Sequence, residues 1–155
     1  MHALIEQIQK QLKGQSLSDD DWLAVLDPVL QHFGAAVGTI HRLDAQGEFL
    51  HLVVQRGIPP MLRDTVTKIP VGKGMAGLAA QRREPVQVCN LQTDTSGAAK
   101  PGAKLTQMEG SIAVPVLVGD RLVGTLGVGK PVAHTFTPEE TDLLMQIAGL
   151  IGATW

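Results

Sequence analysis

I-P-V-G-K-G-M-A-G-L-A-A-Q-R-R-E-P-V-Q-V-C-N-L, residues 69–91, is the stretch of sequence that decides the fold. Pro70 holds the backbone extended, and Gly72 and Gly74 allow a sharp turn with positive φ. The residues from Met75 to Gln81 are good helix formers and supply about two turns of helix. The first half of the stretch therefore predicts the end of a strand, a glycine turn and a short helix.

The second half of the stretch predicts a strand that returns beside the turn. Arg82-Arg83-Glu84 is a polar connection, and Pro85 ends any helix that precedes it. Val86 and Val88 alternate with polar residues, which is the period of a half-buried strand, and Leu91 extends the apolar run. The turn, the helix and the returning strand together predict one wall of a compact pocket.

This order of elements resembles the GAF family of small sensory domains. Its members carry a similar P-x-G-x-G turn, a short helix, an arginine before a proline, and a strand that closes in a D-L-like element, which is Asn90-Leu91 here. The resemblance continues in Ser111–Val116, in Gly124–Gly129 and in the final helix from Thr137, and it extends from about Asp19 over nearly the whole chain. It implies an α+β fold with a six-stranded antiparallel sheet. The N- and C-terminal helices would cover one face, and the short helix and a lid loop would cover a ligand pocket on the other.

Length and composition predict one packed globular domain over residues 1–155, without disulfides. Three Phe, no Tyr and a formal charge of −2 offer little for stacking on bases or for attracting phosphates, so we expect no nucleic-acid partner. The single cysteine, Cys89, fits a reducing compartment. The N-terminal stripe of apolar residues is too interrupted for a signal peptide or a membrane span. We therefore expect a cytoplasmic protein that does not bind membranes.

Periodicity and turn residues predict the remaining elements. An N-terminal amphipathic helix is expected within residues 1–17, followed by a helix that Ser18 caps and Gly34 ends. Thr137-Pro138-Glu139-Glu140 predicts the start of the last helix, with a threonine cap and a glutamate that completes the capping box. Two hairpins are expected between these helices, with strands at residues 37–43, 48–55, 111–118 and 121–129. Pro115 lacks a backbone donor, which predicts a bulge or an edge in its strand.

The segment Gln92–Glu109 has turn-forming residues and no apolar periodicity. A loop of this length in a compact domain is typical of a lid or a binding loop. We therefore predict a mobile lid, with one helical turn around residues 105–108.

The run Gly72–Gly77 matches the G-x-G-x-x-G pattern of dinucleotide sites, with Asp94 near the position of their ribose-binding acid. Such a site requires a buried parallel strand before the glycines and a long crossover helix after them. Pro70 and Pro85 leave room for only about eight helix-competent residues between them, so a structural turn is favoured.

His41 and His51 raise the alternative of a metal site. They would face each other across the first hairpin if its loop had three residues. Two imidazoles alone make a weak site, and the chain has no His-x-x-x-His pair. We favour solvated histidines on a half-exposed sheet face and expect no metal.

One enzymatic branch of the GAF family, the free methionine-(R)-sulfoxide reductases, is similar around the glycine turn, even to the run I-P-V-G-x-G. These enzymes use one cysteine in the turn and others in the lid, because an attacking thiolate and a resolving thiol are both required. Ala76 occupies the turn position that carries cysteine, and the lid has no cysteine.

Two other activities of the GAF family are also disfavoured. Relatives that attach a bilin often have a histidine after the attachment cysteine, whereas Cys89 is followed by Asn90. Cyclic-nucleotide-binding relatives carry an N-K-x-x-F-x-x-x-D-E pattern, which does not occur in this sequence.

We therefore expect a small-molecule-binding sensory or regulatory domain in signal transduction, with no catalysis of its own. A reductase-like enzyme and a ligand-free dimerisation module are the alternatives. The resemblance places the pocket beneath the lid, and five residues are expected to converge on it: Met75, Cys89, Asn90, Met108 and Ser111. Cys89 nevertheless has the alternative role of a small buried hydrophobic residue. The sequence identifies neither ligand nor cofactor, and surplus apolar helical surface predicts a homodimer through the terminal helices.

Overall fold

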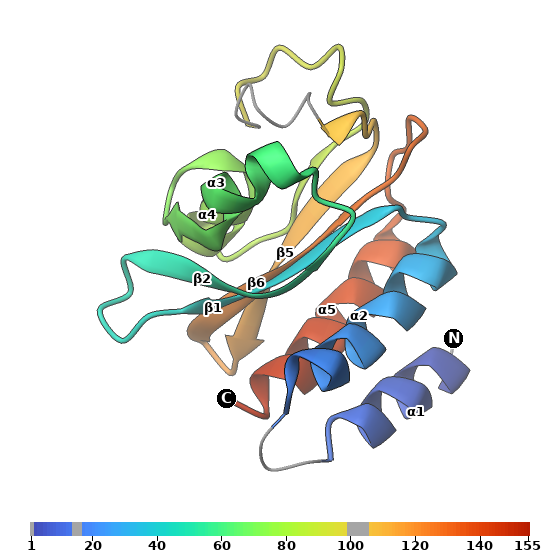
Figure 1. The fold of residues 1–155 in the computed structure, drawn as a ribbon, viewed down its shortest axis with the longest axis vertical. Coiled ribbons are helices and arrows are strands. Elements are labelled where there is room, and N and C mark those ends of the chain that lie inside the picture. Colours follow the sequence, from blue (N-terminus) through green and yellow to red (C-terminus); the bar gives the residue numbers. More distant parts are fainter. Residues whose placement is uncertain (1, 14–16, 99–105) are drawn as a thin grey trace.

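The computed structural model describes residues 2–13, 17–98 and 106–155, and it has an α+β architecture built on one sheet (Figure 1). The helices are α1 (His2–Gln11), α2 (Asp19–Phe33), α3 (Arg63–Thr67), α4 (Gly74–Arg82) and α5 (Pro138–Gly152), with a 3₁₀ turn η1 (Pro60–Leu62). The strands are β1 (Val37–Leu43), β2 (Phe49–Arg56), β3 (Lys68–Pro70), β4 (Val86–Val88), β5 (Ser111–Val118) and β6 (Arg121–Gly129). Within these described residues, no helix is long and apolar enough to cross a membrane.

The six strands form one antiparallel sheet in the order β3-β2-β1-β6-β5-β4. The two predicted hairpins, β1–β2 and β5–β6, meet through β1 and β6 in the centre of the sheet. Asp44 closes the first hairpin, because its Oδ1 accepts from the backbone N–H groups of Glu48 and Phe49 at 3.0 and 3.4 Å. The α+β fold with a six-stranded antiparallel sheet is thus confirmed.

Helices α2 and α5 pack on one face of the sheet, and α1 lies outside them (Figure 1). The two inner helices begin at the predicted caps: Ser18 and Thr137 each complete a capping box, with Asp21 and Glu140 respectively. Gly38 allows α2 to approach β1, because a Cβ there would lie 2.6 Å from Leu30 Cδ2. The helical layers and this sheet face enclose the main hydrophobic core.

The apolar stripe of α1 is buried within the same chain. Leu4, Ile8 and Leu12 have exposed fractions of 7%, 0% and 9% and belong to the core cluster that includes α2 and α5. The surplus helical surface on which the homodimer was predicted is therefore largely covered by the chain itself. The oligomeric state stays a prediction.

Pro115 lies in β5 beyond the end of its edge neighbour. Strand β4 pairs with β5 only from Ser111 to Ala113, so at Pro115 the strand has β6 on one side and no strand on the other. The register shift in β5 falls later, between Val116 and Leu117. Of the two predicted explanations, an edge position therefore accounts for the proline.

The glycine turn and α4 cover the opposite face of the sheet, together with η1 and α3 (Figure 1). The turn is closed by a hydrogen bond from the backbone N–H of Gly72 to the carbonyl of Gly77, at 2.8 Å. Strand β3 before it is a three-residue antiparallel edge strand, not the buried parallel strand of a dinucleotide fold. The structural interpretation of the glycine pattern is confirmed.

Only the two ends of the predicted lid, residues 92–98 and 106–109, belong to the described part of the chain. They are joined near their bases, where the Leu91 N–H donates to the Glu109 carbonyl at 2.7 Å and the Gln92 side chain donates to the Met108 carbonyl at 2.9 Å. Of the helical turn predicted around residues 105–108, residue 105 lies outside the described residues, and Thr106 has 3₁₀ and Gln107 turn conformation. The mobility predicted for Gln92–Glu109 stays a prediction.

Candidate functional site

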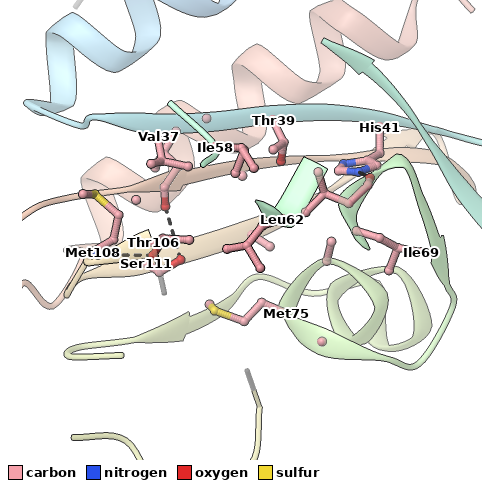
Figure 2. Close-up of a pocket in the computed structure, with 18 of the residues that line it drawn as sticks. Val37, Thr39, His41, Ile58, Leu62, Ile69, Met75, Thr106, Met108 and Ser111 are labelled. Carbon is pink, nitrogen blue, oxygen red and sulfur yellow. Dashed lines mark hydrogen bonds between the residues drawn. The ribbon is translucent and has the colours of Figure 1, made fainter. Parts of the chain in front are cut away.

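A cavity of about 390 Å³ lies between the sheet and the layer formed by η1, α3 and α4 (Figure 2). Its size is within the range of about 300–1,000 Å³ that is typical of small-molecule sites. The lining side chains are mostly aliphatic or small, and they come from β1, β5, β6, the roof segment 58–69, the first turn of α4 and the end of the lid.

The floor of the cavity exists because small residues share one face of the central strands. Gly127 and Gly129 in β6 lie opposite Ala113 and Ser111 in β5, and all four line the cavity. The residues that alternate with them, such as Leu126 and Val128, point to the helical core and are 1% and 3% exposed. Since successive strand residues alternate between faces, this pattern leaves space on the cavity face and fills the core on the other.

The roof is built from aliphatic side chains that follow β2. Ile58 and Leu62 have exposed fractions of 6% and 9%, and Val66 from α3 joins them. Figure 2 shows Thr39 and His41 on the sheet side, with Leu62 and Met75 across the cavity from them. The arrangement encloses a largely apolar space with a few polar groups at its wall.

His41 is the deeply buried polar group of this wall, with 1% of its surface exposed. Its Nε2 lies 2.7 Å from the Val66 carbonyl oxygen, which can only accept, so Nε2 carries the proton. Nδ1 is buried and has no hydrogen-bond partner among the described residues. The expectation of a solvated histidine at this position was wrong: His41 lies on the same face of β1 as Thr39, and the layer that contains α3 covers its ring.

The register of the first hairpin also answers the question of a histidine pair. His41 lies opposite Leu52, and His51 lies opposite Arg42, so the two imidazoles are not cross-strand partners. His51 is instead paired with Asp44, at 3.5 Å between Nε2 and Oδ2. In the described part of the chain, no three His, Cys, Asp or Glu side chains are grouped as metal ligands would be.

Burial lowers the pKa of His41 below its ordinary value of 6.5, against the opposing effect of the Val66 hydrogen bond, and the nearby His51 lowers it further. The unfolded chain, with an ordinary histidine, therefore binds more protons than the folded chain as the pH falls through 6.5. We expect the free energy of unfolding to decrease between pH 7 and pH 5. Denaturant titrations at both pH values measure this decrease.

The control for this pH effect is His41→Gln, which keeps a side-chain N–H for the Val66 carbonyl and has no group that titrates. The decrease in unfolding free energy between pH 7 and pH 5 should be smaller in this variant, while the other histidines contribute equally in both proteins. An equal decrease in the two proteins would show that the His41 pKa is not lowered by folding.

Three of the five predicted site residues come together at the cavity. Met75 lies in the first turn of α4, Met108 at the end of the lid and Ser111 at the start of β5, and all three line the space. The Ser111 hydroxyl also donates to the Val128 carbonyl at a long 3.5 Å, so its oxygen is still able to accept from a ligand.

Cys89 and Asn90 are not among the residues that line the cavity. The alternative of a buried Cys89 was wrong, because its side chain is exposed: Val86 and Val88 point inward from β4, and the next residue follows the outward alternation. Asn90 instead links the two ends of the predicted lid: its Nδ2 donates to the Glu109 carboxylate at 3.2 Å, and its Oδ1 accepts from the Gln92 N–H at 3.0 Å. Leu91 is the residue of this segment that reaches the cavity.

The floor glycines, Thr39, His41 and the roof were missed by the sequence-based prediction of the site. The small residues at alternate positions of β5 and β6 were a usable signal, because they face away from the core positions Leu126 and Val128. The roof residues carry no comparable signal, since their place above the cavity depends on how the chain passes over the sheet.

Comparisons with known proteins agree with this architecture. The family model of the GAF domain matches residues 23–155. The GAF domain of an Acinetobacter phosphoenolpyruvate-protein phosphotransferase superposes with a TM-score of 0.79 at 21% identity, covering 99% of this chain and 90% of that chain. A putative GAF sensor protein from Burkholderia vietnamiensis superposes with a TM-score of 0.75 at 24% identity, covering 96% and 89%.

An enzyme has the same fold. The free methionine-R-sulfoxide reductase from Neisseria meningitidis, in complex with its substrate, superposes with a TM-score of 0.75 at 19% identity, covering 99% of this chain and 86% of that chain. These low identities show a shared fold alone. No curated protein matches the sequence significantly. Because the family model covers most of the chain, the protein is a member of the GAF domain family.

Proposed function

We propose that this protein is a sensory or regulatory domain that binds a small molecule in the cavity beneath α3 and α4 and catalyses no reaction itself. The observation that carries the proposal is the cavity, which combines an aliphatic lining with a few polar groups, as ligand sites commonly do. A ligand there would contact the sheet, α3, α4 and the lid at once, so binding would change the order of these elements together.

The thiol chemistry argues against the reductase alternative. Reduction of a sulfoxide by cysteine requires one thiolate to attack and a second thiol to resolve the oxidised sulfur. The chain has one cysteine, Cys89, which is exposed and does not line the cavity, whereas Ala76 does. The similarity to the reductase therefore supports a shared ligand-binding shape better than a shared reaction.

Native mass spectrometry of the freshly purified protein tests the proposal. We expect an adduct mass for a non-covalent small molecule that is lost on denaturation. Adding that molecule back should raise the melting temperature as its concentration exceeds the dissociation constant. Absence of any adduct, together with no melting shift across a metabolite panel, would favour a ligand-free module. Turnover of free methionine sulfoxide would contradict the non-catalytic role.

A further inference from the structure

We propose that the ligand is an uncharged molecule with a mostly hydrocarbon body and one hydrogen-bonding group, the class that simple aliphatic alcohols represent. This inference rests on the proposed function and names the ligand class of the same cavity.

Apolar side chains surround the cavity on the sides away from the sheet. They come from the roof segment, from α4 and from the ends of the lid, and their aliphatic or thioether groups line the space: Ile58, Leu62, Ile69, Met75, Leu91 and Met108 (Figure 2). The small residues of β5 and β6 already described form the floor below them. Such a lining favours hydrocarbon, because each CH₂ group that leaves water for it tightens binding about three- to fourfold.

The polar side chains of the wall are largely engaged within the protein. His41 Nε2 donates to the Val66 carbonyl at 2.7 Å, and the Thr106 hydroxyl oxygen accepts a backbone N–H at 3.2 Å. The Ser111 hydroxyl donates to a backbone carbonyl at a long 3.5 Å, so its oxygen is still able to accept from one ligand O–H group. These groups suit a single neutral hydrogen bond and not the several strong partners that a buried ion requires.

The charges around the cavity offer little stabilisation to an ion. Among the described residues that line it there is no Asp or Glu, and Lys73 is the only one with a permanently charged side chain. Lys73 is exposed, so water screens its ammonium group and weakens its attraction for a ligand anion. A ligand carboxylate or ammonium group would therefore lose its hydration without an equivalent gain.

The test uses a matched series of probes with isothermal titration calorimetry on the full chain. The uncharged probes are 1-alkanols of about four to nine carbons, which are small enough for a cavity of this class. We expect their affinity to rise about three- to fourfold with each added CH₂ group until the cavity is filled, and then to stop rising. The alkanoate and the alkylammonium with the same number of carbons should each bind at least about tenfold more weakly than the alkanol.

Two neighbouring residues of η1 provide variants that locate the alkanol. Leu62 lines the cavity and is 9% exposed, whereas Met61 is 74% exposed and is not among the lining residues. Leu62→Ala enlarges the cavity, so the tightest-binding alkanol should become longer by about one to three carbons. Met61→Ala removes apolar volume from the surface of the same turn and should leave the preferred chain length as it is.

Melting temperatures verify that both variants are folded. Val66→Ala, a smaller deletion at a half-buried position of the lining, replaces Leu62→Ala if that variant does not fold. A longer preferred alkanol in both the lining variant and Met61→Ala, or in neither, would show that the alkanols bind outside this cavity and would overturn the inference.

The results also separate this inference from the proposed function. Alkanoates or alkylammonium ions that bind as tightly as the alkanols overturn the uncharged class but leave a ligand-binding cavity. The uncharged class is also overturned if no alkanol shows saturable binding, or if a co-purified adduct is identified as a charged molecule. The proposed function fails separately, if the purified protein carries no adduct and no metabolite shifts its melting temperature.

Discussion

Gly77→Ala is expected to destabilise the folded protein by about 2–4 kcal/mol. A Cβ at this position would lie 2.5 Å from the Pro70 carbonyl oxygen and 3.1 Å from the Gly72 backbone nitrogen. Both neighbours are backbone atoms of the glycine turn, so the clash cannot be relieved by a change of side-chain rotamer. Relief requires α4 to move away, which weakens the 2.8 Å hydrogen bond between Gly72 and Gly77.

Denaturant titration measures this loss, and Gly149→Ala is the matched control. Gly149 lies in α5, and a Cβ there would meet no atom within 4 Å. Alanine at that site should stabilise the protein by about 0.5–1 kcal/mol, because glycine is the poorer helix former. If the two substitutions change stability in the same direction, close approach at Gly77 is not what requires glycine.

Thr39→Phe is expected to abolish ligand binding while the fold persists. Thr39 lies on the cavity floor opposite Gly127, which has no side chain, so a phenylalanine ring has room to lie over the glycine. The ring would then occupy space that the ligand needs. Because the surrounding side chains are aliphatic, they can pack against the ring, and no polar group is buried without a partner. The co-purified adduct in native mass spectra should disappear.

Thr39→Val is the control for this substitution, because it keeps the shape of threonine and loses only the hydroxyl group. Binding should persist, weakened by at most about tenfold if the hydroxyl contacts the ligand. Melting temperatures of the two variants without ligand verify that both are folded. A phenylalanine variant that retains the same adduct would show that the molecule binds outside this cavity.

The family resemblance, together with local turn signals, located part of the candidate site. Met75, Met108 and Ser111 line the cavity, and each flanks a turn, a loop end or a strand start that is visible in the chain. Cys89 and Asn90 were expected beside them but do not line the cavity. The alternation of Val86 and Val88 argued for an outward Cys89, and Asn90 forms the local turn bonds that asparagine commonly forms.

The helix caps at Ser18 and Thr137, both hairpins and the glycine turn follow from neighbours in the sequence, since periodicity, caps and turns depend on residues a few positions apart. The fold class was implied by the resemblance of these elements, in their order, to the GAF family. Only the tertiary structure decided that the segment with Val66 covers and buries His41, and that Gly127 and Gly129 align with Ala113 and Ser111 to leave a cavity. Those features depend on the register between strands and on a roof segment that crosses the sheet. Contacts between distant residues set both, because a shift of one residue in register exchanges the two faces of a strand.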